Sequence, residues 1–204
     1  MIAIIDYGVG NLRSVYNAVN FISPKSKSIV TSDPDQILKA DRLIFPGQGA
    51  MPGCVKELDK RGLKEVLIES ARHKPFFGIC LGLQMLFEIS DEGNQQGFGL
   101  LPGKVIKFKG DYKERIKIPH MGWNSVIQSN QHPMWRNIKN GSKFYFVHSY
   151  FAEISNDKIV VGQTEHGENF ASAVAKENIF ASQFHPEKSA AVGLQLLENF
   201  ISWK

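Results

Sequence analysis

Short apolar runs alternate with helical periodicity in the first half of the chain. Apolar runs predict β-strands at Ile2–Asp6, Ile29-Val30, Leu43–Phe45 (closed by Pro46-Gly47) and Phe76–Ile79. Helical spacing and helix-start signals predict helices from Leu12 to Val19, after Asp33-Pro34 as N-cap and first turn, over Leu63–Arg72 and over Leu81–Ile89. Strands that alternate with helices in this way indicate a parallel sheet with helices on both faces.

The second half of the chain has a different pattern. Short β-rich runs separated by polar turns predict strands at Val105–Phe108, Ser125–Gln128, Phe144–Val147, Ile159–Thr164, Phe170–Ala175 and Ile179–Phe184. We expect them to form a mixed or antiparallel extension of the same open sheet. A final helix is predicted over Val192–Trp203, with Leu194, Leu197 and Ile201 at helical spacing. Because no linker, repeat or low-complexity stretch interrupts these patterns, we predict a single α/β domain over residues 1–204.

Composition and charge narrow the possible functions. Hydrophobic residues make up 43% and charged residues 22% of the 204 positions, which is ordinary for a globular protein and excludes disordered and fibrous classes. The net charge of +4 is spread along the chain, so we expect no nucleic-acid partner. The local exception is Lys104–Lys117, with six Lys and Arg against two acids, which we interpret as a solvated face.

No targeting or membrane signal is recognisable. The N-terminus lacks a basic region before its apolar residues and reaches Asp6 at once, unlike a secretory signal. No apolar run approaches the roughly 20 residues that span a bilayer. Two cysteines in a chain of this length do not make a disulfide framework. We therefore predict a cytoplasmic protein without a membrane contact, and we expect neither a metal nor a cofactor.

The segment Gly78-Ile79-Cys80-Leu81-Gly82 joins an apolar strand to an apolar helix. This G-x-C-x-G pattern is the cysteine version of the nucleophile elbow, in which the turn is too tight for side chains at its flanks. The elbow should lift the sulfur to the C-terminal edge of the sheet and place it at a helix N-terminus, which favours a thiolate. Cys54 has no such context, so we expect an ordinary buried side chain.

A nucleophilic cysteine needs a base, and six histidines could supply it: His73, His120, His132, His148, His166 and His185. His185 follows an apolar strand in the sequence His185-Pro186-Glu187. A residue before proline is extended, and alternate side chains on an extended segment share a face. Glu187 can therefore hold the imidazole of His185 and fix its tautomer.

Acyl transfer also needs hydrogen-bond donors for the developing oxyanion. The backbone N–H of Leu81 follows the nucleophile directly. A second donor is predicted in the glycine-rich loop Pro46–Ala50, where Gly47 and Gly49 allow backbone conformations that expose N–H groups, with Gln48 between them. A Pro-Gly pair after a strand is more often an ordinary turn, so the loop by itself is weak evidence.

These motifs resemble those of the class I glutamine amidotransferases, which carry a P-G-x-G loop, a G-x-C-x-G-x-Q elbow and a late H-P-E. All three occur here in that order and cover nearly the whole chain. Within the family, four segments are similar to glutaminase subunits that serve a cyclase of histidine biosynthesis: Asp6–Leu12, Pro119–Asn124, Phe144–Tyr150 and Gln183–Ser189. Gln48 departs from the family pattern, which often has an aliphatic residue there. The departure matters little if only its backbone N–H is used.

The resemblance implies a role for each matching residue. The triad would be Cys80, His185 and Glu187, with the oxyanion bound by the backbones of Gln48 and Leu81. Residues implied to bind glutamine are Gly47, Gly49, Gln84, Glu92, Ser149 and Tyr150, with Glu92 on the α-ammonium group. The family also implies a partner, a cyclase subunit with a (β/α)₈ barrel, contacted through Asn11, Trp123 and Tyr145 in a heterodimer.

The sequence leaves two other functions open and disfavours a third. The same triad could feed ammonia to another amidation pathway, for instance one that makes a surface-polysaccharide sugar. It could also belong to a stand-alone hydrolase of γ-glutamyl bonds, which would need no partner. A catalytically idle binding module is disfavoured because the triad is intact.

Overall fold

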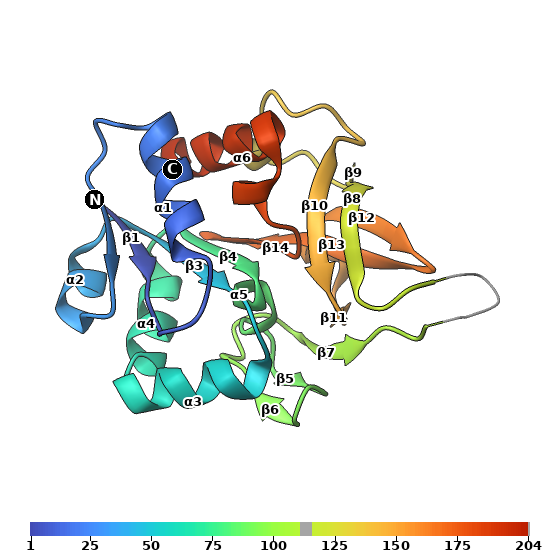
Figure 1. Cartoon of the computed structure of the whole chain (residues 1–204), viewed down its shortest axis with the longest axis horizontal. Coiled ribbons are helices and arrows are strands. Elements are labelled where there is room, and N and C mark those ends of the chain that lie inside the picture. Colours follow the sequence, from blue (N-terminus) through green and yellow to red (C-terminus); the bar gives the residue numbers. More distant parts are fainter. Residues whose placement is uncertain (111–115, 204) are drawn as a thin grey trace.

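A mixed eight-stranded sheet runs through the centre of the molecule (Figure 1). The computed structural model describes residues 1–110 and 116–203. The strand order is β2-β1-β3-β4-β14-β13-β12-β9. The bounds of these strands, in sheet order, are Ser28–Thr31, Ile2–Ile5, Arg42–Gly47, Phe76–Cys80, Ile179–Ser182, Glu168–Lys176, Val160–His166 and Ile127–Gln128.

The sheet changes from parallel to antiparallel along its width. Strands β2, β1, β3, β4 and β14 are parallel, whereas β13, β12 and β9 continue the sheet in antiparallel pairs. This confirms the predicted open, mostly parallel α/β sheet with an antiparallel C-terminal extension. The parallel strands end at one edge, so Gly47, Cys80 and the residues after Ser182 come together there.

Helices cover both faces of the parallel strands, as the sequence predicts. Their bounds are α1 Leu12–Ile22, α2 Pro34–Lys39, α3 Met51–Arg61, α4 Lys64–His73, α5 Leu81–Gln84 and α6 Ala190–Ser202. The expected helix start at Asp33 is confirmed, since its side chain accepts a hydrogen bond from the Asp35 N–H at 2.9 Å. Helix α3 was not predicted, because Pro52-Gly53 resembles a turn, although Met51, Cys54 and Leu58 bury one face.

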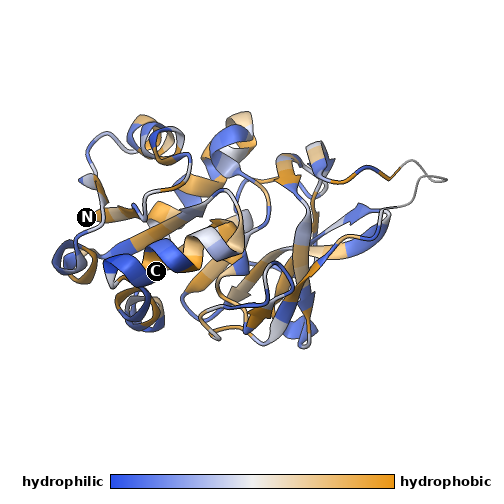
Figure 2. Cartoon of the chain, turned by 60° about the horizontal axis from the view of Figure 1, so that its bottom comes forward, coloured by the Kyte–Doolittle hydropathy of each residue, from blue (hydrophilic) through white to orange (hydrophobic). Residues whose placement is uncertain are grey.

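Alternate residues along each central strand belong to two different hydrophobic clusters, one on each face of the sheet. Ile2 and Ile4 pack with α1 and α6 on one face, while Ala3 and Ile5 pack with α2, α3 and α4 on the other. Figure 2 shows this pattern as hydrophobic strands between helices with polar outer faces. Because side chains alternate along a strand, a strand with helices on both sides must be apolar throughout.

Not all of the predicted extension joins the main sheet. The runs Val105–Phe108 and Phe144–Val147 belong to two smaller sheets, with orders β11-β7-β5-β6 and β10-β8. Their strands are β5 Ile89–Ser90, β6 Gln95–Gln96, β7 Gly103–Lys107, β8 His120–Ser125, β10 Lys143–His148 and β11 Tyr150–Ile154. The expectation of one continuous sheet was wrong here, because Phe144 and Phe146 on β10 bury their rings against the main core instead. Short 3₁₀ turns complete the fold at Pro133–Trp135, Asp157–Ile159 and Pro186–Lys188.

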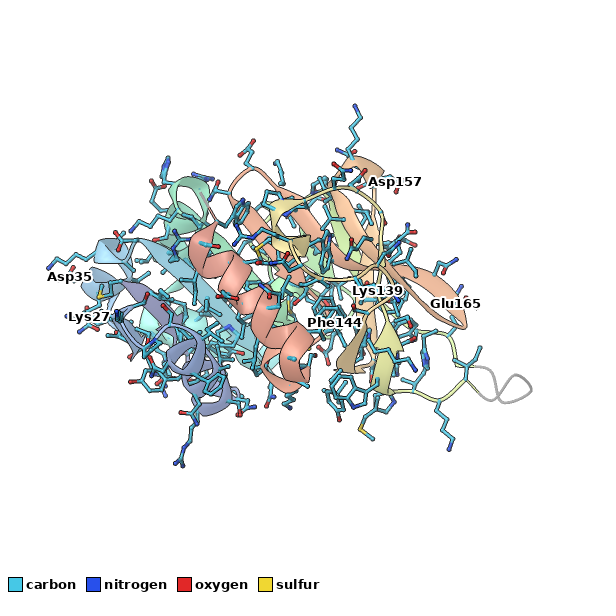
Figure 3. All side chains as sticks on the ribbon, turned by 90° about the horizontal axis from the view of Figure 1, so that it is seen from above. Lys27, Asp35, Lys139, Phe144, Asp157 and Glu165 are labelled. Carbon is cyan, nitrogen blue, oxygen red and sulfur yellow. The ribbon has the colours of Figure 1, made fainter. Side chains whose placement is uncertain are left out.

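Charged side chains lie at the periphery of the molecule. Lys27, Asp35 and Asp157 are exposed and project outward in Figure 3, whereas Phe144 is fully buried. Residues 111–115 of the basic stretch lie outside the described residues. Within residues 1–110 and 116–203, the helices are all too short or too polar to span a membrane.

Candidate active site

Cys80 sits at a strained turn between β4 and α5. Its φ of 56° lies in the left-handed region that a residue with a side chain rarely adopts. Glycines are required on both sides of it. A Cβ on Gly78 would lie 2.6 Å from the Gly82 carbonyl oxygen, and one on Gly82 would lie 2.0 Å from the Phe45 carbonyl oxygen. The predicted elbow geometry therefore has a steric basis in close backbone packing.

The helix after the elbow is much shorter than predicted. It ends at Gln84 instead of Ile89. Beyond it, backbone carbonyls accept hydrogen bonds from the 97–101 loop, including 2.6 Å from the Phe98 N–H to the Met85 oxygen and 2.9 Å from Leu100 to Leu86. These bonds replace those that would continue the helix. A four-residue helix has little macrodipole, so the expected stabilisation of a thiolate by the helix is correspondingly small.

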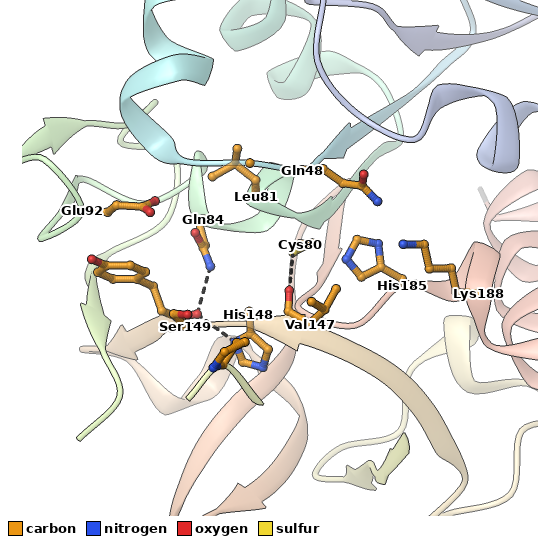
Figure 4. Close-up of a pocket in the computed structure, with 13 residues that line it drawn as sticks. Gln48, Cys80, Leu81, Gln84, Glu92, Val147, His148, Ser149, His185 and Lys188 are labelled. Atoms are coloured by element: carbon orange, nitrogen blue, oxygen red, sulfur yellow. Dashed lines mark hydrogen bonds between the residues drawn. The ribbon is translucent and has the colours of Figure 1, made fainter. Parts of the chain in front are cut away.

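His185 and Glu187 form a buried pair beside the cysteine. Nδ1 of His185 donates to Oε1 of Glu187 at 2.9 Å, and each side chain is 2% exposed. Burial alone would lower the pKa of His185, but Cys80 and the Glu187 carboxylate more than offset this and raise the pKa to about 10. Among the described residues, Nε2 of His185 has no hydrogen-bond partner. The ring stands beside Cys80 in Figure 4, so Nε2 is free to exchange a proton with the sulfur.

Two neighbours hold the sulfur in place. The thiol contacts the Val147 carbonyl oxygen at 4.0 Å, and the Gln183 side-chain amide donates to Sγ at 3.6 Å. Gln183 is fully buried. This glutamine was not predicted as a site residue. Its position two residues before His185, directly after a buried strand, was the available signal.

A cavity of about 430 Å³ opens beside the sulfur (Figure 4). It collects most of the residues implied for glutamine and the oxyanion, which are Gln48, Gly49, Leu81, Gln84, Glu92, Ser149 and Tyr150, together with Cys80 and His185. Gly47 does not line the cavity. It packs behind the site, where an added Cβ would lie 2.5 Å from the Leu81 Cβ. The cavity also includes Pro119, Val147, His148 and Lys188, which the sequence analysis did not assign to the site.

The polar side chains of the cavity are partly engaged by the protein itself. The Gln84 amide donates to the Tyr150 carbonyl oxygen at 3.0 Å and to Oε1 of Gln183 at 3.2 Å. Oε2 of Glu92 accepts the Met51 N–H at 2.8 Å, which caps the start of α3. A carboxylate held in this way at the cavity wall keeps a fixed position for a cationic group.

Two of the three residues expected at a partner interface, Trp123 and Tyr145, are cross-strand neighbours. Trp123 on β8 is 52% exposed, and its ring lies 6.2 Å from that of Tyr145, its cross-strand neighbour on β10. Nζ of Lys188 lies 5.9 Å from the centre of the Tyr145 ring and reaches the cavity. Asn11 is the residue before α1 and is half-buried. The exposed Trp123, the half-buried Tyr145 and the cavity residue Lys188 are thus successive neighbours.

The fold and the site together are typical of one class of α/β protein. A cysteine at an elbow after a parallel strand, beside an imidazole bonded to a buried carboxylate, is the arrangement of enzymes that transfer an acyl group through a thioester. The family model for class I glutamine amidotransferases matches residues 3–203. The chain belongs to this family.

Individual relatives match along almost the whole chain. The imidazole glycerol phosphate synthase subunit HisH of Aromatoleum aromaticum is 55% identical over 208 residues, covering 99% of this chain and 98% of that protein. The subunit of the same name from Nitrosomonas europaea is 53% identical over 207 residues, with the same coverage. Among solved structures, the glutaminase domain of Trypanosoma brucei CTPS with bound acivicin has a TM-score of 0.69 at 18% identity, covering 100% of this chain and 94% of that one. At that identity the likeness shows the fold alone.

Proposed function

We propose that the chain hydrolyses L-glutamine to glutamate and ammonia, and delivers the ammonia to a cyclase subunit of imidazole glycerol phosphate synthase in histidine biosynthesis. The observation that carries this proposal is the cavity at Cys80, whose walls combine the nucleophile, the imidazole and the side chains suited to a free amino acid. The relatives named above support the choice of synthase, and a cytoplasmic location is part of the same proposal. The cyclase makes imidazole glycerol phosphate and an aminoimidazole carboxamide ribonucleotide.

The first half of the reaction forms a thioester. Because the pKa of His185 is raised to about 10, Nε2 already holds the proton shared with Cys80, and Sγ attacks the side-chain amide carbon of glutamine. The backbone N–H groups of Gln48 and Leu81 stabilise the resulting oxyanion. Leu81 is the first residue of α5, so its N–H has no partner within the helix. Collapse of the intermediate breaks the C–N bond, and His185 returns the proton to the leaving ammonia.

The second half of the reaction releases glutamate. His185 takes a proton from water, which attacks the thioester carbon, and the same N–H groups stabilise the second oxyanion. The bond to Sγ then breaks and the cysteine regains its proton. Glu187 keeps the Nδ1 proton in place throughout, which leaves Nε2 as the acceptor. Glu92 binds the α-ammonium group of glutamine, and the Ser149–Tyr150 backbone binds its carboxylate end.

The proposed partner is a (β/α)₈-barrel subunit that covers the surface around Trp123, Tyr145 and Asn11. Ammonia in neutral water is mostly protonated and loses its nucleophilic lone pair, so its release must be sheltered by the consuming subunit. The loop that carries His185 is tied to β10, since the His185 N–H donates to the Tyr145 carbonyl oxygen at 2.9 Å. A partner seated on Tyr145 can therefore influence the triad directly. We expect the partner and its ligand to raise glutaminase turnover by a coupling of about 1–3 kcal/mol or more.

The test measures glutamate release from the chain alone, with the barrel subunit, and with the barrel subunit plus its nucleotide substrate. Equal rates in all three conditions would identify a stand-alone γ-glutamyl hydrolase instead. Activation by the barrel of another amidation pathway would assign the chain to that pathway.

A Cys80→Ser variant separates the two half-reactions. It should lose glutamine hydrolysis by a factor on the order of 10⁶. The complex should still form product when ammonium salt is supplied at high pH, because the cyclase needs only free ammonia. A complex that stays inactive with ammonia would mean that Cys80 serves assembly or the synthase chemistry.

A further inference from the structure

A pair of buried histidines lies at the wall of the glutamine cavity, which His148 lines. His120 on β8 and His148 at the end of β10 face each other across the two-stranded sheet, and Nδ1 of His120 is 2.9 Å from Nε2 of His148. Both are buried, and His166 stacks on His120 with ring centres 4.1 Å apart. Within the described residues no group of three or more His, Cys, Asp or Glu is arranged for a metal ion. The pair therefore needs another explanation.

The partners at both ends of the pair determine its protonation. Nδ1 of His148 is 2.8 Å from the Tyr150 carbonyl oxygen, which can only accept, so Nδ1 carries a proton. At the other end, Nδ2 of Asn124 lies 3.2 Å from Nε2 of His120 and donates to it. The Asn124 side-chain oxygen accepts the Ser125 N–H at 2.8 Å, which fixes the orientation of this amide. Nδ2 also donates to the carbonyl oxygen of Glu165, a residue of β12 that is labelled in Figure 3.

These constraints agree on a single direction of hydrogen bonding. Asn124 donates to His120, His120 donates to His148, and His148 donates to the Tyr150 carbonyl. Each ring then has one N–H and one acceptor nitrogen, as a neutral imidazole does. Burial lowers the pKa of His148 to about 3 and that of His120 to about 4, so both rings stay neutral at physiological pH.

With the hydrogen bonds in this direction, the Tyr150 carbonyl oxygen accepts from two donors. His148 reaches it from one side and the Gln84 amide reaches it from the elbow side at 3.0 Å. The preceding carbonyl, that of Ser149, accepts the Phe108 N–H at 3.1 Å. Both carbonyls of the Ser149–Tyr150 segment are thus bound within the protein. The position of this segment at the cavity wall depends on those bonds.

We propose that His148, held in register by His120, is a positioning residue that fixes the Ser149–Tyr150 segment for binding of the amino-acid end of glutamine. This inference rests on the proposed glutaminase function. The His120–His148 hydrogen bond also connects β8, which carries the exposed Trp123, to the cavity wall through side chains alone. His148 does not touch the reacting amide, so its loss should weaken glutamine binding more than the chemical step.

Replacement of His148 by two different side chains tests the role of the Nδ1 donor. His148→Leu removes the donor and should raise KM for glutamine about tenfold, the equivalent of about 1.4 kcal/mol, with kcat changed less than threefold. His148→Asn places an amide N–H where Nδ1 stood and should restore KM to within about threefold of wild type. His166→Leu is the matched control, since it removes a stacked imidazole outside the donor chain and should leave both constants unchanged.

The same pair of substitutions tests His120, and imidazole ¹⁵N shifts test the hydrogen-bond direction without an activity assay. His120→Leu should raise KM and His120→Asn should restore it. In the wild-type protein, imidazole ¹⁵N shifts should show His148 as the neutral Nδ1–H tautomer between pH 6 and 9. An Nε2–H tautomer, an unchanged KM in His148→Leu, or equal defects in the Leu and Asn variants at wild-type melting temperature would overturn the proposal. A wild-type protein that shows the tautomer but does not hydrolyse glutamine would refute the function and leave the hydrogen-bond chain intact.

Discussion

Substitution of Glu187 separates its charge from its hydrogen bond. Glu187→Gln keeps an acceptor for the His185 Nδ1 proton but removes the negative charge. A charge-assisted hydrogen bond exceeds a neutral one by about 1–2 kcal/mol, so kcat should fall about 5- to 30-fold. Glu187→Ala leaves the ring without an orienting partner, and kcat should fall by up to about 10⁴-fold. Loss of His185 itself should be more severe than either change.

The structure also predicts how substitutions of Glu187 and Cys80 change the pKa of His185. Burial lowers it, whereas Cys80 and then Glu187 raise it to about 10. Glu187→Ala should therefore lower this pKa, and Cys80→Ser should lower it further. Glutamate release with the partner bound gives the rates, and an NMR titration of the imidazole gives the pKa.

A carboxylate outside the site provides the matched control for the Glu187 variants. Glu153→Gln removes an exposed carboxylate that pairs with Lys104 at 3.2 Å and should leave turnover unchanged. If Glu187→Gln were as inactive as His185→Ala, Glu187 would do more than orient the ring. Wild-type turnover in Glu187→Ala would refute the triad, because the 2.9 Å contact with Nδ1 would then have no role.

Three further predictions concern the elbow, the second cysteine and pH. Gly82→Ala should destabilise the protein by about 1–3 kcal/mol or more and abolish turnover, because its Cβ would lie 2.0 Å from the Phe45 carbonyl oxygen; urea unfolding measures the loss, and an unchanged midpoint would contradict it. Burial raises the pKa of Cys54 to about 12, so an alkylating glutamine analogue should not label it, and Cys54→Ala should retain turnover; peptide mapping that finds label on Cys54 would contradict this. Burial lowers the pKa of His120 and His148 below 6.5, so the unfolded chain binds more protons than the folded chain below that pH. The free energy of unfolding should then fall with decreasing pH by up to about 1.4 kcal/mol per unit for each histidine, and His148→Leu should show a shallower fall in urea unfolding at pH 7 and pH 5.

The sequence by itself determined the parallel core and the position of Cys80 at the elbow after β4. Strands such as Ile2–Ile5 are apolar at every position because helices cover both faces, and this pattern is local. The elbow glycines and the extended conformation of His185 before Pro186 are also readable locally. The predicted extended path to Glu187 was wrong, because Pro186–Lys188 forms a 3₁₀ turn and Glu187 reaches Nδ1 of His185 from that turn.

Only the tertiary structure decided the features that depend on contacts between residues far apart in the sequence. Helix α5 stops at Gln84 because the 97–101 loop satisfies the carbonyls beyond it. Strand β10 leaves the main sheet because its phenylalanines pack on the core, and this brings His148 opposite His120. Gln183 meets the sulfur of Cys80 across 103 positions of sequence. Local pattern specifies what each segment can form, whereas long-range hydrogen bonds and side-chain packing select among those forms and assemble the wall of the cavity.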